Sequence, residues 1–146
     1  MAPKAPPEQA AKQFFYAMMQ NQCQVAWRTF SGKSQDHFLK WTLDYLYRKH
    51  QQAAEFAQIG VKEVRILFEN NDSSLMKSFW RRFYHYSNAG ELFRFGYFSA
   101  KSVQGNKATV EVLMKFPDGR TKTQELPMVL EKNTWRIAYV EGELPF

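Results

Sequence analysis

The segments ATVEVLMKF (residues 108–116), TKTQELPMVL (121–130) and WRIAYV (135–140) carry the strongest structural signal in the chain. Apolar and polar residues alternate along the first of them, which is the two-residue period of a strand with one buried face. Pro127 cannot donate a hydrogen bond, so its strand is expected to be bulged there or to turn that position outward. Turn-forming sequences separate the strands, at 104–107, 117–120 and 132–134.

An earlier strand is expected before these segments, because Phe93, Phe95 and Tyr97 stand at alternate positions. Together the four predict an antiparallel meander, since short turns join consecutive strands. Trp135 and Ile137 share one face of the closing strand, and we expect both side chains to point into the core.

The first half of the chain has helical periodicity instead. Apolar residues from Ala11 to Met18 recur at helical spacing, which predicts a helix over 8–22. Residues 61–69 also allow a strand, but their spacing favours a helix. A short helix is expected over 25–30, and a third helix is expected to begin after an N-cap at Ser34. Residues 51–58 are expected to continue that helix or to form a connector. A later helix is expected to begin after a cap at Asp72 or Ser73 and to end at a break over 88–90.

Amphipathic helices followed by a sheet with one apolar face bury both surfaces most simply if the sheet curls around the helices. The expected fold class is therefore α+β, a roll with N-terminal helices packed in a curved four-stranded antiparallel sheet. A chain of 146 residues has the size of a single domain. We assign residues 8–146 to that domain and residues 1–7, which contain three prolines, to a flexible leader.

Composition excludes several classes of protein. No apolar run approaches the roughly 20 residues that a membrane-spanning helix requires, which predicts a soluble protein. Cys23 is the only cysteine, so neither an internal disulfide nor a zinc site is expected. The sequence also lacks a glycine-rich phosphate loop and the GxSxG and HExxH motifs, and we expect no cofactor.

The net charge of the chain indicates possible binding partners, and the composition of the leader (residues 1–7) bears on the cellular location of the protein. The net charge of +6 suits a polyanion or an acidic protein surface, but it is also common in ordinary soluble domains. If Met1 is the native start, the protein is cytoplasmic. The Pro/Ala composition of the leader equally suits a spacer that follows a removed export signal.

The sequence resembles the nuclear transport factor 2-like superfamily, the cone-shaped fold also called cystatin-like, and particularly its small bacterial members of unknown function. The resemblance is carried by AAKQFFYAMMQNQCQVAWRTFS (10–31), GNKATVEV (105–112) and MVLEKNTWRI (128–137). The chain departs from the family in lacking a clear early strand between its helices. The resemblance implies a cone that binds ligands or partners, and a homodimer, because superfamily members often pair through their sheets.

Superfamily members also include small lyases and isomerases, so a catalytic alternative stays open. Such an enzyme needs acid and base groups held together in an apolar cavity. The candidates are His37 and Asp44, seven residues apart on one helix face, and His85 from a later helix. No motif assigns these residues a catalytic role. The alternative interpretation is that each is an ordinary polar residue without a part in catalysis.

Aromatic and basic residues are concentrated between residues 79 and 98. Such mixtures occur in single-stranded nucleic-acid binders, where bases stack on exposed rings. Nucleic acid is disfavoured, because the helices-first order does not match an RNA-recognition motif. A simpler hypothesis is that these rings pack in the core. A third hypothesis is that they line the mouth of a cone that accepts an apolar ligand.

The leading hypothesis is a non-catalytic binding or assembly module. Its cone cavity or sheet face would engage a small hydrophobic ligand or a protein partner. The residues expected to make these contacts are Trp41, Tyr45, Trp80, Arg81, Tyr84, Arg94 and Tyr97.

Overall fold

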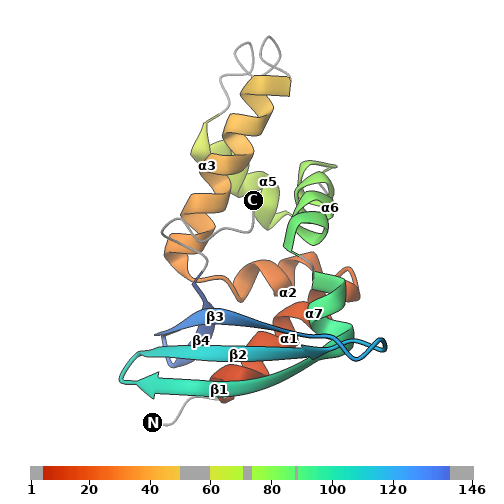
Figure 1. The fold of residues 1–146 in the computed structure, drawn as a ribbon. Helices are drawn as coiled ribbons and strands as arrows, with labels where there is room; N and C mark the ends of the chain where they lie inside the picture. Colours follow the sequence, from red (N-terminus) through yellow and green to blue (C-terminus); the bar gives the residue numbers. More distant parts are fainter. Residues whose placement is uncertain (1–4, 50–59, 71–73, 88, 139–146) are drawn as a thin grey trace.

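The computed structural model describes residues 5–49, 60–70, 74–87 and 89–138. These residues form six helices packed against an open four-stranded antiparallel sheet, so the expected α+β class is confirmed (Figure 1). The helices are α1 (Pro7–Met19), α2 (Cys23–Arg28), α3 (Gly32–Lys49), α5 (Val61–Glu69), α6 (Ser74–Ser87) and α7 (Ala89–Phe95). The strands are β1 (Gly96–Gln104), β2 (Lys107–Lys115), β3 (Thr121–Glu131) and β4 (Thr134–Ile137).

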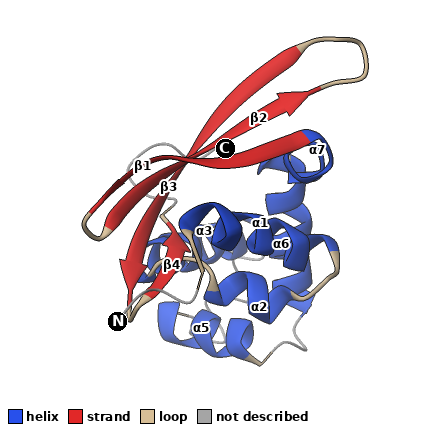
Figure 2. Ribbon diagram, turned by 90° about the horizontal axis from the view of Figure 1, so that it is seen from below, coloured by secondary structure: helices blue, strands red, loops and turns tan. Residues whose placement is uncertain are grey.

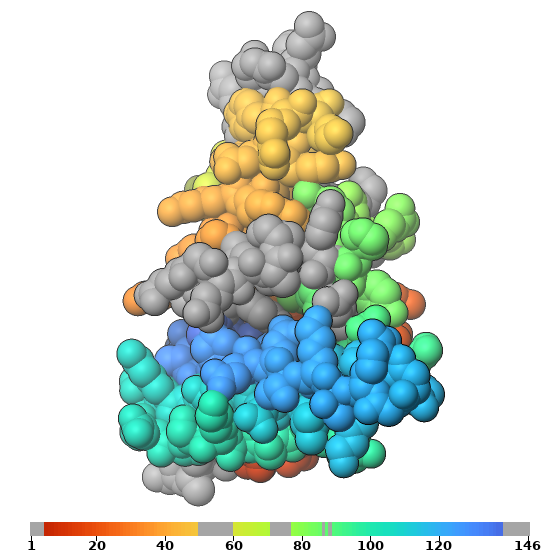
Figure 3. All heavy atoms as spheres, viewed as in Figure 1, coloured from red at the N-terminus to blue at the C-terminus, as the bar shows by residue number. Residues whose placement is uncertain are grey.

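All six helices lie on one side of the sheet (Figure 2). Helix α1 packs against β1, β2 and β4, and α7 packs against β1 and β2, so these two helices cover the inner face. Helix α3 rises away from the sheet and packs against α5, which in turn contacts α6 (Figure 1). In the space-filling view of Figure 3, the strands accordingly form one end of the molecule and α3 extends toward the other.

The sheet has the predicted order β1-β2-β3-β4, with each strand antiparallel to the next. The hairpin residues adopt the left-handed backbone that tight turns need: φ is +62° at Gly105, +89° at Gly119, +50° at Lys132 and +62° at Asn133. Glycine and asparagine tolerate this region, which explains why the turns could be recognised in the sequence.

The two faces of the sheet differ as the alternation predicted. Ala108, Val110, Val112 and Met114 of β2 are all buried, while the residues between them are half-buried. Trp135 and Ile137 of β4 are buried as well, which confirms their expected direction. The edge strand β1 is mostly exposed.

Pro127 lies in β3 without a bulge, because pairing of β3 with β2 is continuous through Thr109 and Pro127. The Leu130 N–H donates to the Asn106 carbonyl across the β2 side, and the Ala138 N–H donates to the Pro127 carbonyl on the opposite side. Backbone groups alternate sides along a strand, so the missing N–H of Pro127 faces away from β2, beyond the end of β4. The observed alternative is therefore the one without a bulge, with the Pro127 nitrogen on the side away from β2.

The expected strand through Phe93 and Phe95 is wrong. Both residues belong to α7, and the strand begins only at Gly96. Ala89 and Leu92, three residues apart, are buried against the sheet, so the helix gains apolar contacts that a strand would lose. Helix α6 ends near the expected break, at Ser87, but the chain resumes as a helix.

The cap of α3 is also corrected. The helix begins at Gly32, and the side chain that caps its first turn is Ser31 rather than Ser34. The Ser34 N–H donates to Ser31 Oγ at 3.1 Å, Ser31 Oγ donates to Ser34 Oγ at 2.8 Å, and Ser34 Oγ donates to the Ile137 carbonyl at 3.2 Å. This buried network ties the start of α3 to β4, where Phe30 forms a parallel bridge with Ile137.

Replacing Ser31 with alanine is expected to lower the free energy of unfolding by about 1–2 kcal/mol, because it removes the cap from a buried helix start. A urea titration measures the change. Ser99 is exposed on β1, and Ser99→Ala should stay within about 0.5 kcal/mol of the wild type. Equal effects of the two substitutions would contradict the capping role.

The structure describes only some of the remaining segments that were predicted from the sequence. Residues 61–69 form a helix, as favoured. Helix α1 begins at Pro7, whose side chain is buried, and residues 1–4 of the expected leader lie outside the described residues. The connector expected over 51–58 and the cap expected at Asp72 or Ser73 lie outside them as well.

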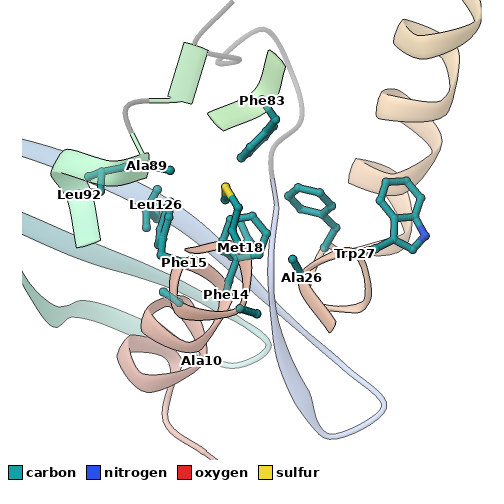
Figure 4. Packing of buried hydrophobic residues seen from close by; sticks show 14 of the residues in the cluster. Ala10, Phe14, Phe15, Met18, Ala26, Trp27, Phe83, Ala89, Leu92 and Leu126 are labelled. Atoms are coloured by element: carbon teal, nitrogen blue, oxygen red, sulfur yellow. The ribbon is translucent and has the colours of Figure 1, made fainter. Parts of the chain in front are cut away.

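The core lies between the sheet and the helices and is rich in aromatic rings. Side chains from α1, α2, α6, α7 and β3 converge there, as the labelled residues in Figure 4 illustrate. Phe30 is fully buried at its centre. The centroid of its ring lies within 6 Å of those of five other described rings, which belong to Phe14, Trp27, Phe38, Trp80 and Phe83.

Candidate functional site

The three catalytic candidates lie on α3 and α6. His37 is half-buried on α3, where its ring meets the edge of Phe38 at 5.6 Å. Asp44 is exposed on the same helix, and His85 is exposed on α6. Two pockets among the described residues are set out below, and none of the three candidates lines either of them. Neither of these two pockets therefore brings the candidate acid and base groups together.

Trp41 and Tyr45, two of the expected binding residues, lie against a side chain of the same protein. The guanidinium carbon of Arg82 lies 4.2 Å from the Trp41 ring centroid and 3.7 Å from that of Tyr45. Such cation–π contacts are favourable, most of all when partly shielded from water. These two rings join α3 to α6 and do not form an open binding face.

Arg94 and Tyr97 lie at the surface on α7 and β1. Tyr97 is 64% exposed, stands beside Leu113 on the outer face of the sheet, and lies 5.4 Å from the ammonium nitrogen of Lys115. Neither residue lines a pocket described here.

The other three expected residues come together. Trp80, Arg81 and Tyr84 of α6 line a pocket of about 740 Å³ together with residues at the end of α1 and the start of α2. This volume is typical of small-molecule sites. We call it the α1–α6 pocket, and its lining consists of Met18, Met19, Asn21, Cys23, Lys77, Trp80, Arg81 and Tyr84.

Helix α6 presents two adjacent faces. Phe79 and Phe83 are fully buried and point into the core. The pocket residues 77, 80, 81 and 84 stand at i, i+3, i+4 and i+7, which places them on one side of the helix. The pocket is thus lined by a single helical stripe opposite the turn that joins α1 and α2.

Trp80 belongs to both faces. Its ring is stacked on Phe30, with centroids 5.7 Å apart and planes 5° apart, and it meets Phe79 and Phe83 edge to face. Only 6% of the residue is exposed, so the pocket touches a small part of the indole. Trp80 therefore contributes an apolar floor and little ring surface on which a ligand could stack.

Lys77 and Arg81 supply positive charge at this pocket, and among the described residues no carboxylate lines it. Both side chains are exposed. Within the described ranges, neither forms an ion pair with an acidic side chain. Two cations beside an apolar floor produce a positive potential that attracts an anionic group.

Cys23 contributes an apolar edge and only a weakly nucleophilic thiol. Burial raises the pKa of its thiol above the ordinary value, while hydrogen bonding to its own backbone and the nearby charge of Lys77 act in the opposite direction with smaller effect. The thiol is therefore neutral at pH 7, and a neutral thiol is a weak nucleophile.

Tyr84 forms one wall and depends on Gly90. A Cβ atom at Gly90 would lie 2.6 Å from the Tyr84 hydroxyl oxygen, closer than side-chain atoms approach one another. The absence of a side chain at Gly90 thus lets the Tyr84 ring lie over α7, where 42% of the residue stays exposed.

Sequence reasoning missed five of the lining residues. Lys77 could have been found, because it extends the helical stripe of Trp80, Arg81 and Tyr84 by one turn. Met18, Met19, Asn21 and Cys23 carry no such signal, since they face the pocket only because α1 and α2 pack against α6.

A second hollow, of about 490 Å³, lies where the strands of the sheet meet the start of α3. Ser102, Thr109 and Pro127 form one cross-strand row in it, and Lys33, Lys107 and Glu131 add charges of both signs. The Glu131 carboxylate accepts the Gly32 N–H at 3.2 Å, so the chain itself supplies the anion at this helix terminus.

The described residues contain no cluster of three or more His, Cys, Asp or Glu side chains placed to hold a metal ion. Among their helices, none is both long and apolar enough to cross a membrane.

Comparison with protein-family models, with curated proteins and with solved structures finds no match to this chain.

Proposed function

We propose that this protein is a non-catalytic binding module whose α1–α6 pocket receives an apolar group that carries a negative charge. The group belongs to a small hydrophobic ligand or to a protein partner. One observation carries the proposal: Lys77 and Arg81, which have no acidic partner among the described residues, flank a floor made of Met18, Met19 and Trp80.

Both parts of the pocket favour binding. Burial of apolar surface supplies most of the free energy in such sites, and a few polar groups orient the ligand. An anionic group gains charge-assisted hydrogen bonds from the two cations. An uncharged ligand would gain only the apolar contacts.

Binding is better supported than the two alternatives. A lyase or isomerase needs an acid and a base in the ligand cavity, and His37, Asp44 and His85 lie outside this pocket. A single-stranded nucleic-acid binder needs several exposed rings, whereas Phe79, Trp80 and Phe83 are buried. Membership of the nuclear transport factor 2-like superfamily, with its homodimer, stays a proposal that rests on the helices-then-meander order.

The test uses 1-anilinonaphthalene-8-sulfonate, which combines apolar rings with one sulfonate and fluoresces in apolar sites. We expect saturable binding by the folded protein. Lys77→Gln and Arg81→Gln should each weaken this binding about five- to tenfold, since each removes one charge-assisted contact at a partly exposed site.

The matched controls are Lys62→Gln on α5 and Arg94→Gln on α7, because both cations are exposed and lie outside the pocket lining. All four variants lower the net charge equally, so general electrostatic attraction is the same in each. Nile red serves as an uncharged dye whose affinity should not change. If the dye does not bind, or if the pocket variants and the controls behave alike, the proposed function is wrong.

A further inference from the structure

We propose that the ligand of the α1–α6 pocket is a flexible alkyl chain that ends in one small anionic head group, the chemistry of a fatty acid. This inference rests on the proposed function and narrows it to one class of ligand. It follows from three features of the lining: the spacing of the two cations, the small ring surface that the Trp80 floor offers, and the two methionines.

The cations suit a single head group. Lys77 and Arg81 are four residues apart on α6, so their side chains project from neighbouring turns of the same face. A lysine ammonium and an arginine guanidinium at this spacing can both donate to one carboxylate, and the guanidinium can do so with two parallel hydrogen bonds. Tyr84 and Asn21 add neutral donors to the lining, and no acidic side chain of the described part of the chain opposes the anion there.

The floor of the pocket disfavours flat ligands, and the exposed ring of the described lining is that of Tyr84 at the wall. One face of the Trp80 ring is stacked on Phe30, and Phe79 and Phe83 meet the ring edge to face. Aromatic ligands gain from offset stacking or edge contacts with an accessible ring. Because Trp80 is almost completely buried, it offers a ligand little of this surface.

The methionines favour a flexible chain. Met18 and Met19 line the pocket at the end of α1, and Met18 points from α1 toward α6 (Figure 4). Methionine has three rotatable bonds and a polarizable sulfur, so it adapts its shape to irregular apolar groups. An alkyl chain can follow such a lining without requiring a rigid slot.

Cys23 provides a reporter of occupancy. It is the only cysteine in the chain, it lines the pocket, and its half-buried thiol is the single site for iodoacetamide alkylation. A chain seated against α1 and α2 should slow this alkylation, which intact-protein mass spectrometry measures as one mass increment. Protection places the ligand in this pocket and not elsewhere on the surface.

The first experiment measures how hexanoate, octanoate, decanoate and dodecanoate, below their micelle concentrations, protect Cys23 and displace 1-anilinonaphthalene-8-sulfonate. Affinity should rise about fourfold with each methylene buried until the pocket is full. Decanoate should bind at least about tenfold more tightly than decanol, decylammonium or 2-naphthoate, which change the head group or the body one at a time.

Substitutions in the pocket separate the contribution of the anionic head group to affinity from that of the alkyl chain. Lys77→Gln and Arg81→Gln should reduce the preference for decanoate over decanol and leave the chain-length dependence intact, whereas Lys62→Gln should change neither.

A lipid bilayer could present the same chemistry, so a second experiment measures cosedimentation of the protein with phosphatidylglycerol and with phosphatidylcholine vesicles. Selective binding to the anionic vesicles that Arg81→Gln abolishes would assign the alkyl anion to a membrane lipid. Binding of monomeric decanoate alone would assign it to a free fatty acid.

The inference and the proposed function fail differently. If 1-anilinonaphthalene-8-sulfonate binds through Lys77 and Arg81 but affinity is independent of chain length, or 2-naphthoate binds better than decanoate, the alkyl-anion inference is wrong and the proposed function stands. The inference is also overturned if decanoate binds without protecting Cys23. If the sulfonate dye itself does not use these two cations, both are wrong.

Discussion

Replacing Phe30 with alanine is expected to lower the free energy of unfolding by about 3–5 kcal/mol, the range for removing a fully buried ring. The Phe30 ring contacts rings from α1, α2, α3 and α6, and the chain on either side of it hydrogen-bonds to β4. Removing it leaves a cavity that five separate elements would have to move to fill, so little relaxation is expected. Equilibrium urea unfolding measures the loss.

The control for Phe30→Ala is Tyr97→Ala, which removes an aromatic ring from the exposed face of β1. That variant should lose less than about 1 kcal/mol, as ordinary surface substitutions do. If both variants lose the same stability, Phe30 is not the centre of the core. Because Phe30 supports Trp80, a folded Phe30→Leu variant should also show altered ligand binding in the α1–α6 pocket.

Replacing Gly96 with alanine is expected to cost at least about 3 kcal/mol, the upper part of the range for overpacking. An added Cβ would overlap the backbone carbonyl oxygen of Leu92 and lie 2.6 Å from Val112 Cγ1. A carbonyl oxygen in a helix cannot rotate away as a side chain can. The junction between α7 and β1 would have to open, and with it the contact of α7 with the sheet.

Gly32→Ala is the matched substitution for Gly96→Ala. The nearest atom to a Cβ at Gly32 is Glu131 Oε2 at 3.9 Å, an ordinary contact, so this change should be close to neutral. The melting temperatures of both variants, followed by circular dichroism, make the comparison. A Gly96→Ala protein as stable as Gly32→Ala would mean that α7 ends differently from the structure described here.

The local sequence determined the sheet and most of the helices. Alternation along β2 and the turn residues at Gly105 and Gly119 are properties of neighbouring positions, so they could be recognised without knowing the rest of the fold. The same holds for α5, whose helical spacing decided between helix and strand. The burial of Trp135 and Ile137 followed from their shared strand face.

Two of the corrected elements depended on contacts with distant segments. Phe93 and Phe95 satisfy a two-residue period, yet α7 forms because Ala89 and Leu92 gain a buried position against the sheet. Ser31 and Ser34 are both suitable caps in sequence, and Ser31 takes the role where the start of α3 meets the Ile137 carbonyl of β4. Local propensity is weaker than such tertiary contacts.

For the candidate site as well, some features could be predicted from the sequence and others depended on the tertiary structure. The sequence by itself determined that Trp80, Arg81 and Tyr84 share a helix side, because three- and four-residue spacing is enough for that. Only the tertiary structure decided that Trp41 and Tyr45 hold Arg82, and that Met18, Met19 and Cys23 complete the pocket. The physical reason is that periodicity specifies which side chains share a face, whereas the packing of separate elements decides what that face meets.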